Sequence, residues 1–258
     1  MKNVFIILSG GPSTYDPKDK ELHDQSWDNF VTPPLLRSKS AALHDPKTEE
    51  VHWLIYEPAY KDRWASDSAS QETTPTQYQH TVTIKTKHKR SSHLELLKTR
   101  ASERDWKYEE ISSAQGFWNH INNLKGTKVS RVWFYGHARY DLWLSLDHDP
   151  NNHEAVSPAD SNAIVNRDDI KKLAAFSFVP QRTAACPHKF FGCNTKSFAE
   201  KWASALSVYA EGASGKVDFE KIHDTAGRVI LSSGAQWYQC SKAGASRLLL
   251  SKAGDQVS

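Results

Sequence analysis

The chain has 258 residues, of which 38% are hydrophobic and 24% are charged, and its formal net charge is +3. This balance excludes a disordered chain and gives no reason to expect nucleic acid or an anionic membrane as the main partner. No apolar run is long enough to span a bilayer. The three cysteines are too few, and odd in number, for a disulfide framework, which favours a reducing compartment.

The apolar runs of the sequence predict strands that alternate with amphipathic helices. Residues 4–8 form a continuous apolar run closed by Ser9-Gly10-Gly11-Pro12, which predicts a buried strand followed by a loop. Further strands are predicted, in chain order, at 51–56, 106–111, 129–135, 187–192 and 228–231, with a sixth candidate at 248–250. Helices are predicted at 91–103, 114–124, 167–175 and 197–209, and residues 141–146 are expected to form one arm of a hairpin.

Strands and helices in alternation predict an α/β fold with a mostly parallel central sheet flanked by helices. The sequence contains no internal repeat and no clear linker, so residues 1–258 are expected to form a single domain. Two long polar stretches, near 12–50 and 61–92, are expected to be insertions. The first should be mostly loop, with at most a short helix near Trp27 to Phe30, and the second should carry a solvent-edged strand at 81–85.

Two short motifs combine a buried strand with a chemically reactive side chain. They are Val132-Trp133-Phe134-Tyr135-Gly136-His137 and His188-Lys189-Phe190-Phe191-Gly192-Cys193-Asn194-Thr195. Each is an apolar, aromatic run that ends in a glycine, followed by His137 in the first and by Cys193 in the second. If the two strands are parallel neighbours, both side chains emerge at the carboxyl edge of one sheet, where open α/β sheets place their ligands.

A thiol beside an imidazole is the arrangement that nucleophilic acyl transfer needs. The imidazole stabilises the thiolate and later protonates the leaving amine. The turn that follows Cys193 offers backbone N–H groups to an oxyanion, and the helix start near Ser197 favours a negative sulfur. Taken alone, Cys193 is more simply a buried inert thiol and His137 a satisfied polar residue, and only their matched contexts favour a dyad.

These motifs resemble those of the caspase-like cysteine peptidases, and they are most similar to the separase and CHAT-type branches. There, one strand ends in Gly-His and the next in Gly-Cys or Ala-Cys, as Gly136-His137 and Gly192-Cys193 do here. The separation between histidine and cysteine is close to the caspase value of about 50 residues. The resemblance covers about residues 128–210. It implies a parallel sheet flanked by helices and a cysteine endopeptidase, and bacterial domains of this kind serve as toxins or defence proteases.

The resemblance also implies the catalytic roles. Cys193 would attack a peptide carbonyl, His137 would act as general acid and base, and the backbone N–H groups of Cys193 and Ala138 would hold the oxyanion. The sequence departs from the family where Ala138 replaces the usual glycine, where the caspase Gln-Ala-Cys-x-Gly string is missing, and in Asn194-Thr195-Lys196, which replaces a turn rich in Ser and Gly.

Three residues are candidates for substrate binding. Relatives often cut after Arg or Lys with a carboxylate in the primary pocket, and Asp141 follows His137 closely enough to supply it, although an exposed loop acid is the simpler interpretation. Asn194 is a second candidate, and capping of the next helix is the safer assignment for it. Ser233 follows the predicted strand 228–231 and should line the same sheet edge.

Alternatives from other classes stay open. A catalytically inactive caspase-like module would bind a protein partner through the same cleft, and Ala138 favours it. A metal-dependent phosphoester hydrolase or nuclease would use the histidines and the basic segment 85–90. Cys186, His188, Cys193 and Cys240 or His137 could ligate zinc, but strand alternation should put His188 and Cys193 on opposite faces, so no metal site is predicted. The loop after the first strand lacks both common phosphate-binding patterns.

The expected reaction needs no cofactor. Its partners would be a protein or peptide substrate and an inhibitory or activating protein, with neither nucleic acid nor membrane involved. The apolar run at 4–8 is too short for the core of a signal peptide, so a cytoplasmic protein is expected, with export by a route without a cleaved signal as the alternative.

Overall fold

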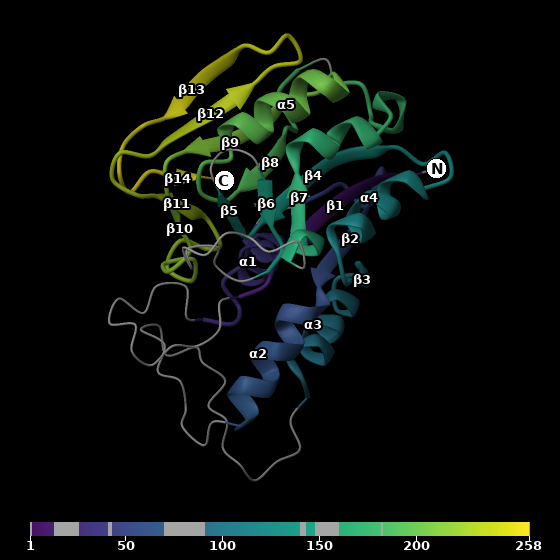
Figure 1. Ribbon diagram of the computed structural model, residues 1–258, viewed down its shortest axis with the longest axis vertical. Coiled ribbons are helices and arrows are strands. Elements are labelled where there is room, and N and C mark those ends of the chain that lie inside the picture. The colour runs from purple at the N-terminus through teal and green to yellow at the C-terminus, as the bar shows by residue number, and fades with distance from the viewer. Residues whose placement is uncertain are drawn as a thin grey trace.

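The structure of the protein, a computed structural model, describes residues 2–12, 26–40, 43–69, 91–139, 143–147, 160–181 and 183–257. The strands of its central sheet are β1 (Asn3–Ser9), β2 (Glu49–Tyr56), β3 (Lys107–Ile111), β4 (Val129–Tyr135), β8 (His188–Phe191), β9 (Ala210–Ser214), β12 (Gln236–Cys240) and β13 (Ser246–Leu250). They form one eight-stranded sheet in the order β13-β12-β9-β8-β4-β1-β2-β3 (Figure 1).

The sheet is mostly parallel, as the sequence predicts. All pairs from β3 through β9 are parallel, and only β12 and β13 run antiparallel to their neighbours. In the parallel part, β2 and β3 extend the sheet on one side of β1, and β4, β8 and β9 extend it on the other. This order reverses between β1 and β4, and doubly wound sheets bind their ligands at the carboxyl ends of the strands beside such a reversal.

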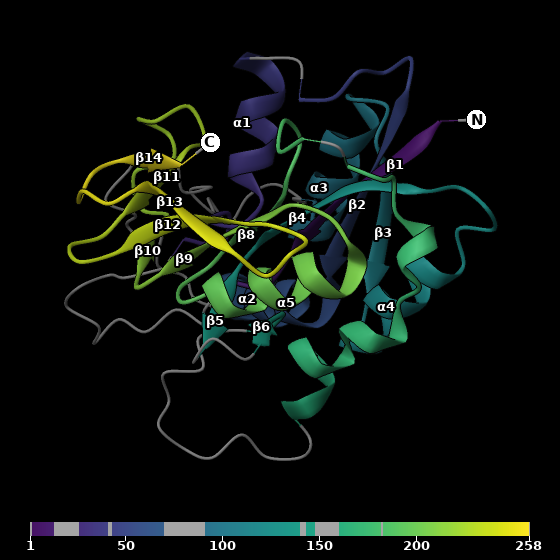
Figure 2. The same ribbon diagram turned by 90° about the horizontal axis from the view of Figure 1, so that it is seen from above.

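Helices cover both faces of the sheet, with α1 on one side and α4 and α5 on the other (Figure 2). The helices are α1 (Thr32–Ser40), α2 (Glu57–Ala69), α3 (His93–Ser102), α4 (Ala114–Asn122) and α5 (Lys196–Leu206). Strand alternation divides the buried side chains into two cores. The α5 face holds Ile6, Phe134 and Trp202, and the α1 face, which α3 also covers, holds Phe5, Tyr135 and Leu97.

Local sequence explains how α3 begins and how α5 packs on the sheet. Helix α3 has a capping box, in which Ser92 Oγ accepts from the Glu95 N–H and Glu95 accepts from the Ser92 N–H, as expected for a start near Ser92. Helix α5 buries Phe198, Trp202 and Leu206, which recur at the spacing of an amphipathic helix. In the described residues, no helix combines the length and the apolar character that crossing a membrane would require.

Two small antiparallel sheets lie beside the central one (Figure 1). The first contains β5 (His137–Arg139), β6 (Trp143–Ser145) and β7 (Ile164–Asn166), so the predicted hairpin arm at 141–146 is confirmed in part. The second contains β10 (Val217–Asp218), β11 (Val229–Leu231) and β14 (Gln256–Val257). Three 3-10 helices complete the described chain: η1 (Asp160–Ala163), η2 (Arg167–Lys172), which lies within the short helix predicted at 167–175, and η3 (Ala175–Ser177).

Some sequence predictions differ from the structure. The stretch 12–50 contains α1, whose first turn holds Pro33 and Pro34. Prolines suit a first turn, although the same residues predict loop from sequence. Helix α2 extends into the second polar stretch, where it occupies residues 61–69. The strand predicted at 228–231 forms as β11, but it belongs to a small sheet. The central strand beside β8 is β9, which the sequence does not predict. The strand expected at 81–85 lies outside the described residues.

Candidate functional site

The register of β4 and β8 makes His137 and Cys193 neighbours along the backbone. Tyr135 pairs with Phe191 in parallel, so each of the two residues lies two positions beyond a paired residue. The Gly136 N–H then donates to the Phe191 carbonyl at 3.2 Å, which holds the segments together beyond the ladder. Both residues therefore lie just beyond the carboxyl ends of their strands, β4 and β8. Both strands lie on the β4 side of the point between β1 and β4 where the strand order reverses.

The same face of the sheet carries both side chains. Tyr135 and Phe191 belong to the α1-face core, and their rings stack with centroids 4.6 Å apart. Two residues further on, Cys193 packs against the same core, and the His137 ring lies 4.8 Å from Phe30, another of its members. Ala138 packs against the opposite core. His137 and Cys193 are therefore not on opposite faces of the sheet, an arrangement that would have excluded a catalytic dyad.

Aromatic and backbone groups surround the two side chains. Phe30 lies between His137 and Phe219, with edge-to-face ring contacts of 4.8 and 4.9 Å. The Cys193 thiol is half-buried and lies 3.8 Å from the Val217 carbonyl, so in its protonated form it can donate to that oxygen. Sequence reasoning missed Phe30, Val217 and Phe219. The only signal was the pair of aromatic residues Trp27 and Phe30 in a polar stretch.

Gly192 is required where the two motifs meet. A Cβ added to it would lie 2.8 Å from the Gly136 carbonyl oxygen, which is too close for a real side chain, and 3.1 Å from the Ala138 Cβ, which is tight. Ala138 itself pairs with Leu144 in the β5–β6 hairpin. The alanine that departs from the family pattern therefore packs directly over the turn that carries Cys193.

The candidate substrate residues have different surroundings. The Asn194 Oδ1 atom accepts from the Gly215 N–H at 2.9 Å, and Asn194 does not cap α5, whose N-cap residue is Thr195. Its predicted role in substrate binding stays a prediction. Ser233 is exposed in the turn before β12, and it reaches the carboxyl edge because Gln236 pairs antiparallel with Ser214, and not because it follows a central strand. Asp141 lies outside the described residues.

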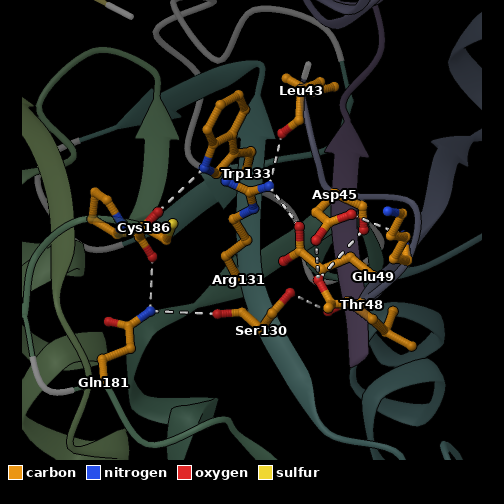
Figure 3. Close-up of polar contacts among 12 residues, drawn as sticks. Leu43, Asp45, Thr48, Glu49, Ser130, Arg131, Trp133, Gln181 and Cys186 are labelled. Atoms are coloured by element: carbon orange, nitrogen blue, oxygen red, sulfur yellow. Dashed lines mark hydrogen bonds and ion pairs between the residues drawn. The ribbon is translucent and has the colours of Figure 1, made fainter. Parts of the chain in front are cut away.

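The cysteines and the histidine proposed as zinc ligands do not converge. Cys186 is exposed before β8, at the amino ends of the strands, where the Gln181 Nε2 group donates to its carbonyl at 2.8 Å (Figure 3). His188 lies on the α5 face, where burial lowers its pKa to about 3, and Cys193 lies on the other face. Burial raises the pKa of the Cys240 thiol to about 12. Over the described ranges, no group of three or more His, Cys, Asp or Glu side chains is arranged to hold a metal ion.

The loop after β1 is a poor phosphate cradle. Its Gly10 N–H donates to the Tyr135 carbonyl at 2.9 Å, and its Gly11 N–H donates to the Leu146 carbonyl at 2.6 Å. Phosphate loops bind through free backbone N–H groups, and these two are already used within the protein. In the described part of this loop, residues 10–12, the two glycines therefore do not offer the free N–H groups through which dinucleotide-binding sheets hold phosphate.

Comparisons with known proteins do not identify the chain. No family model matches it, and no curated protein matches it. Among solved structures, it is similar to the C-terminal domain of the coenzyme A biosynthesis bifunctional protein CoaBC, with 11% sequence identity, coverage of 98% of this chain and 90% of that chain, and a TM-score of 0.35. A likeness this low supports no argument about function. The fold and the site define an α/β protein with a histidine and a cysteine at one sheet edge.

Proposed function

We propose that the protein is a cysteine endopeptidase of the caspase-like type, with Cys193 as nucleophile and His137 as general acid and base. The observation that supports this most is the parallel register of Tyr135 with Phe191, from which His137 and Cys193 leave the same edge and face of the sheet. The partial exposure of Cys193 also suits a nucleophile, which must reach its substrate.

The proposed reaction is acyl transfer in two stages. The Cys193 thiol loses its proton to His137, its sulfur bonds to the substrate carbonyl carbon, and the electron pair of the C=O bond moves to oxygen. Backbone N–H groups of Cys193 and Ala138 would stabilise that oxyanion. When it collapses, the C–N bond breaks and His137 protonates the leaving amine. Water, deprotonated by His137, then attacks the thioester and releases the acid and the free thiol.

The proposed substrate is a protein or peptide, and an inhibitory or activating protein would control the site. An assay of protein cleavage tests this. Cys193→Ala should abolish cleavage, and His137→Ala should lower kcat about 10²–10⁴-fold, the usual contribution of a positioned acid–base group. Cys186→Ala is the matched control, because that cysteine is exposed and lies at the other end of the strands, and it should retain full activity.

Cleavage that survives Cys193→Ala but is lost with EDTA would overturn the proposal and favour metal-dependent chemistry. Labelling of Cys193 by a peptidyl acyloxymethyl ketone gives a second readout. Equal labelling of Cys193 and Cys186, unchanged by His137→Ala, would also contradict a catalytic dyad.

A second candidate function is a non-catalytic module that binds a protein partner at the same edge. The observation that favours it is the burial of the histidine: His137 is only 9% exposed as a residue, and its neighbour Phe30 is buried. Such a module would bind its partner with equal affinity before and after Cys193→Ala, and alkylation of Cys193 would show no dependence on His137.

A further inference from the structure

We propose that Asn194 and Thr195 are positioning residues, whose side chains fix the turn that aims Cys193 at its substrate. This inference rests on the proposed function. The two residues lie between β8 and α5, directly after the cysteine, and both are bonded to β9 or to the residue that follows it. Neither contact stabilises the helix start itself, because Thr195 makes no side-chain capping bond.

The Thr195 hydroxyl ties the backbone before Cys193 to β9. It lies 2.7 Å from the Phe190 carbonyl and 3.1 Å from the Gly192 carbonyl, to which its single proton can be donated. It accepts from the Ala213 N–H at 3.0 Å. The side chain is 1% exposed, so these bonds form away from competing water. One hydroxyl therefore fixes the backbone just before Cys193 against the neighbouring strand.

Asn194 holds the other side of the turn in an unusual conformation. Its φ of 55° lies in the left-handed region, which costs most residues other than glycine about 1–2 kcal/mol and costs asparagine less. Two bonds to Gly215 accompany it: the Asn194 N–H donates to the Gly215 carbonyl at 2.8 Å, and its Oδ1 atom accepts from the Gly215 N–H at 2.9 Å. This paired contact is what keeps the strained residue directly after Cys193 in place.

The neighbouring strand is shaped to admit this turn. A Cβ added to Gly212 of β9 would lie 2.6 Å from the Thr195 carbonyl oxygen and 3.0 Å from its hydroxyl oxygen. A central strand tolerates a glycine poorly unless another backbone approaches closely, as Thr195 does here. An unusual backbone conformation that several surrounding contacts hold in place is typical of functional sites. The turn after β8 is held by more contacts than a simple connection between a strand and a helix requires.

The consequence is preorganisation of the nucleophile. An attacking sulfur must be held close to its reacting geometry, and a misplacement of about 1 Å can cost 10²-fold in rate. Loosening the turn should therefore slow reaction at Cys193 and weaken its coupling to His137, even in a protein that stays folded.

The experiment measures the rate of Cys193 alkylation by iodoacetamide against pH in the full chain. Thr195→Val keeps the shape but removes the hydroxyl, and we expect an alkylation rate at pH 7 that is about 10- to 100-fold lower, with the midpoint of the curve shifted toward the value of about 8.5 typical of free thiols. Thr195→Ser restores the hydroxyl and should return the rate to within about twofold of the original. Asn194→Gly relieves the strain but removes the Oδ1 contact, and should give an intermediate curve.

Thr225→Val is the matched control. The Thr225 hydroxyl also contacts backbone carbonyls, those of Lys221, Ile222 and Arg228, but it lies outside the turn of Cys193. Curves for Thr195→Val and Asn194→Gly that coincide with the control would overturn the positioning role and leave the dyad intact. A Cys193 that behaves as a free thiol in the unaltered protein, whatever residue stands at 137, would overturn both proposals.

Discussion

His188 is a polar residue of the central strand β8 that is buried with a specific hydrogen-bond partner. The His188 ring is fully buried among Phe178 and Trp202, and its Nδ1 atom accepts from the Val132 N–H at 3.0 Å. Burial lowers the pKa of His188 to about 3, so the folded protein holds it neutral over almost the whole acid range. Unfolded, the same side chain binds a proton below about 6.5.

His188 should therefore make the protein less stable in acid. Because the unfolded state binds a proton that the folded state rejects, the free energy of unfolding should fall by about 1.4 kcal/mol for each pH unit between about 6.5 and 3 from this residue. Asparagine does not titrate, and its side-chain oxygen can replace Nδ1 as acceptor, so His188→Asn should make the free energy of unfolding depend less on pH. Urea unfolding at pH 6 and pH 4.5 measures this free energy. An equal loss of stability between the two pH values in both proteins would mean that His188 does not titrate on unfolding.

Thr195 gives a second residue-scale prediction, independent of catalysis. Thr195→Val leaves the buried Ala213 N–H without its acceptor, and such a group costs about 1–3 kcal/mol of stability. The free energy of unfolding should fall by about that amount, and Thr195→Ser should lose less because the oxygen remains. A neutral effect of Thr195→Val would mean that the hydroxyl is not the restraint that the contacts indicate.

At the scale of elements, a chain of four titratable side chains joins α4 to β2 and β3. The His52 Nδ1 and His120 Nε2 atoms lie 2.9 Å apart, so one of them must carry a proton that the other accepts. The outer nitrogens face carboxylates, His52 Nε2 at 2.9 Å from Glu50 and His120 Nδ1 at 2.8 Å from Glu109. Burial lowers the pKa of both imidazoles, while the carboxylates oppose that shift.

This contact should open in acid. When both imidazoles are protonated, two N–H groups face each other and the His52–His120 bond cannot form. Since both folded pKa values lie below 6.5, the stability that the contact adds is present above that pH and is lost as the pH falls through them. Lys107, bonded to Glu50, lowers the pKa of both imidazoles further.

Hydrogen exchange measures this opening. Amide exchange in α4, corrected for its intrinsic pH dependence, should accelerate between pH 7 and pH 5, while α5, which contains no histidine, should change little. The variant His120→Gln should remove the difference between the two helices. Equal acceleration of α4 and α5 would point to general acid unfolding in place of a local contact.

The elements that can be predicted from the sequence are those whose own apolar side chains are enough to bury them. The apolar runs of β1, β4 and β8 give both the strands and the edge that holds His137 and Cys193. Strand β9 escapes prediction because its Glu211 is buried with partners from other strands: Lys189 at 3.3 Å, Trp237 at 3.1 Å and Gln239 at 3.2 Å. Phe30 escapes for a related reason, since its contacts with His137 and Phe219 form only in the folded chain.

At the scale of the whole molecule, one sheet separates two cores of similar make-up. Trp202 is fully buried on the α5 face and Trp53 on the α1 face. The same strands contribute side chains to both cores, so loss of either core should destabilise the whole sheet. This is the physical content of the prediction that the chain forms one domain.

Large-to-small changes on each face test that unity. Trp202→Ala and Trp53→Ala should each lower the free energy of unfolding by about 3–5 kcal/mol, because each leaves a cavity in a close-packed core. Unfolding should stay a single transition, with far-ultraviolet circular dichroism and tryptophan fluorescence giving coincident curves in urea. Separate transitions for the two probes would show that the faces belong to independently folding parts.

If His137 acts on the Cys193 thiol, alkylation of Cys193 should depend on pH in a way that requires the histidine. With mass spectrometry resolving each cysteine, we expect a midpoint below about pH 7.5 for Cys193 that rises toward about 8.5 in His137→Ala. Cys186 supplies the internal reference in the same sample. A Cys193 curve that coincides with that of Cys186 and does not respond to His137→Ala would show that the histidine does not act on the thiol.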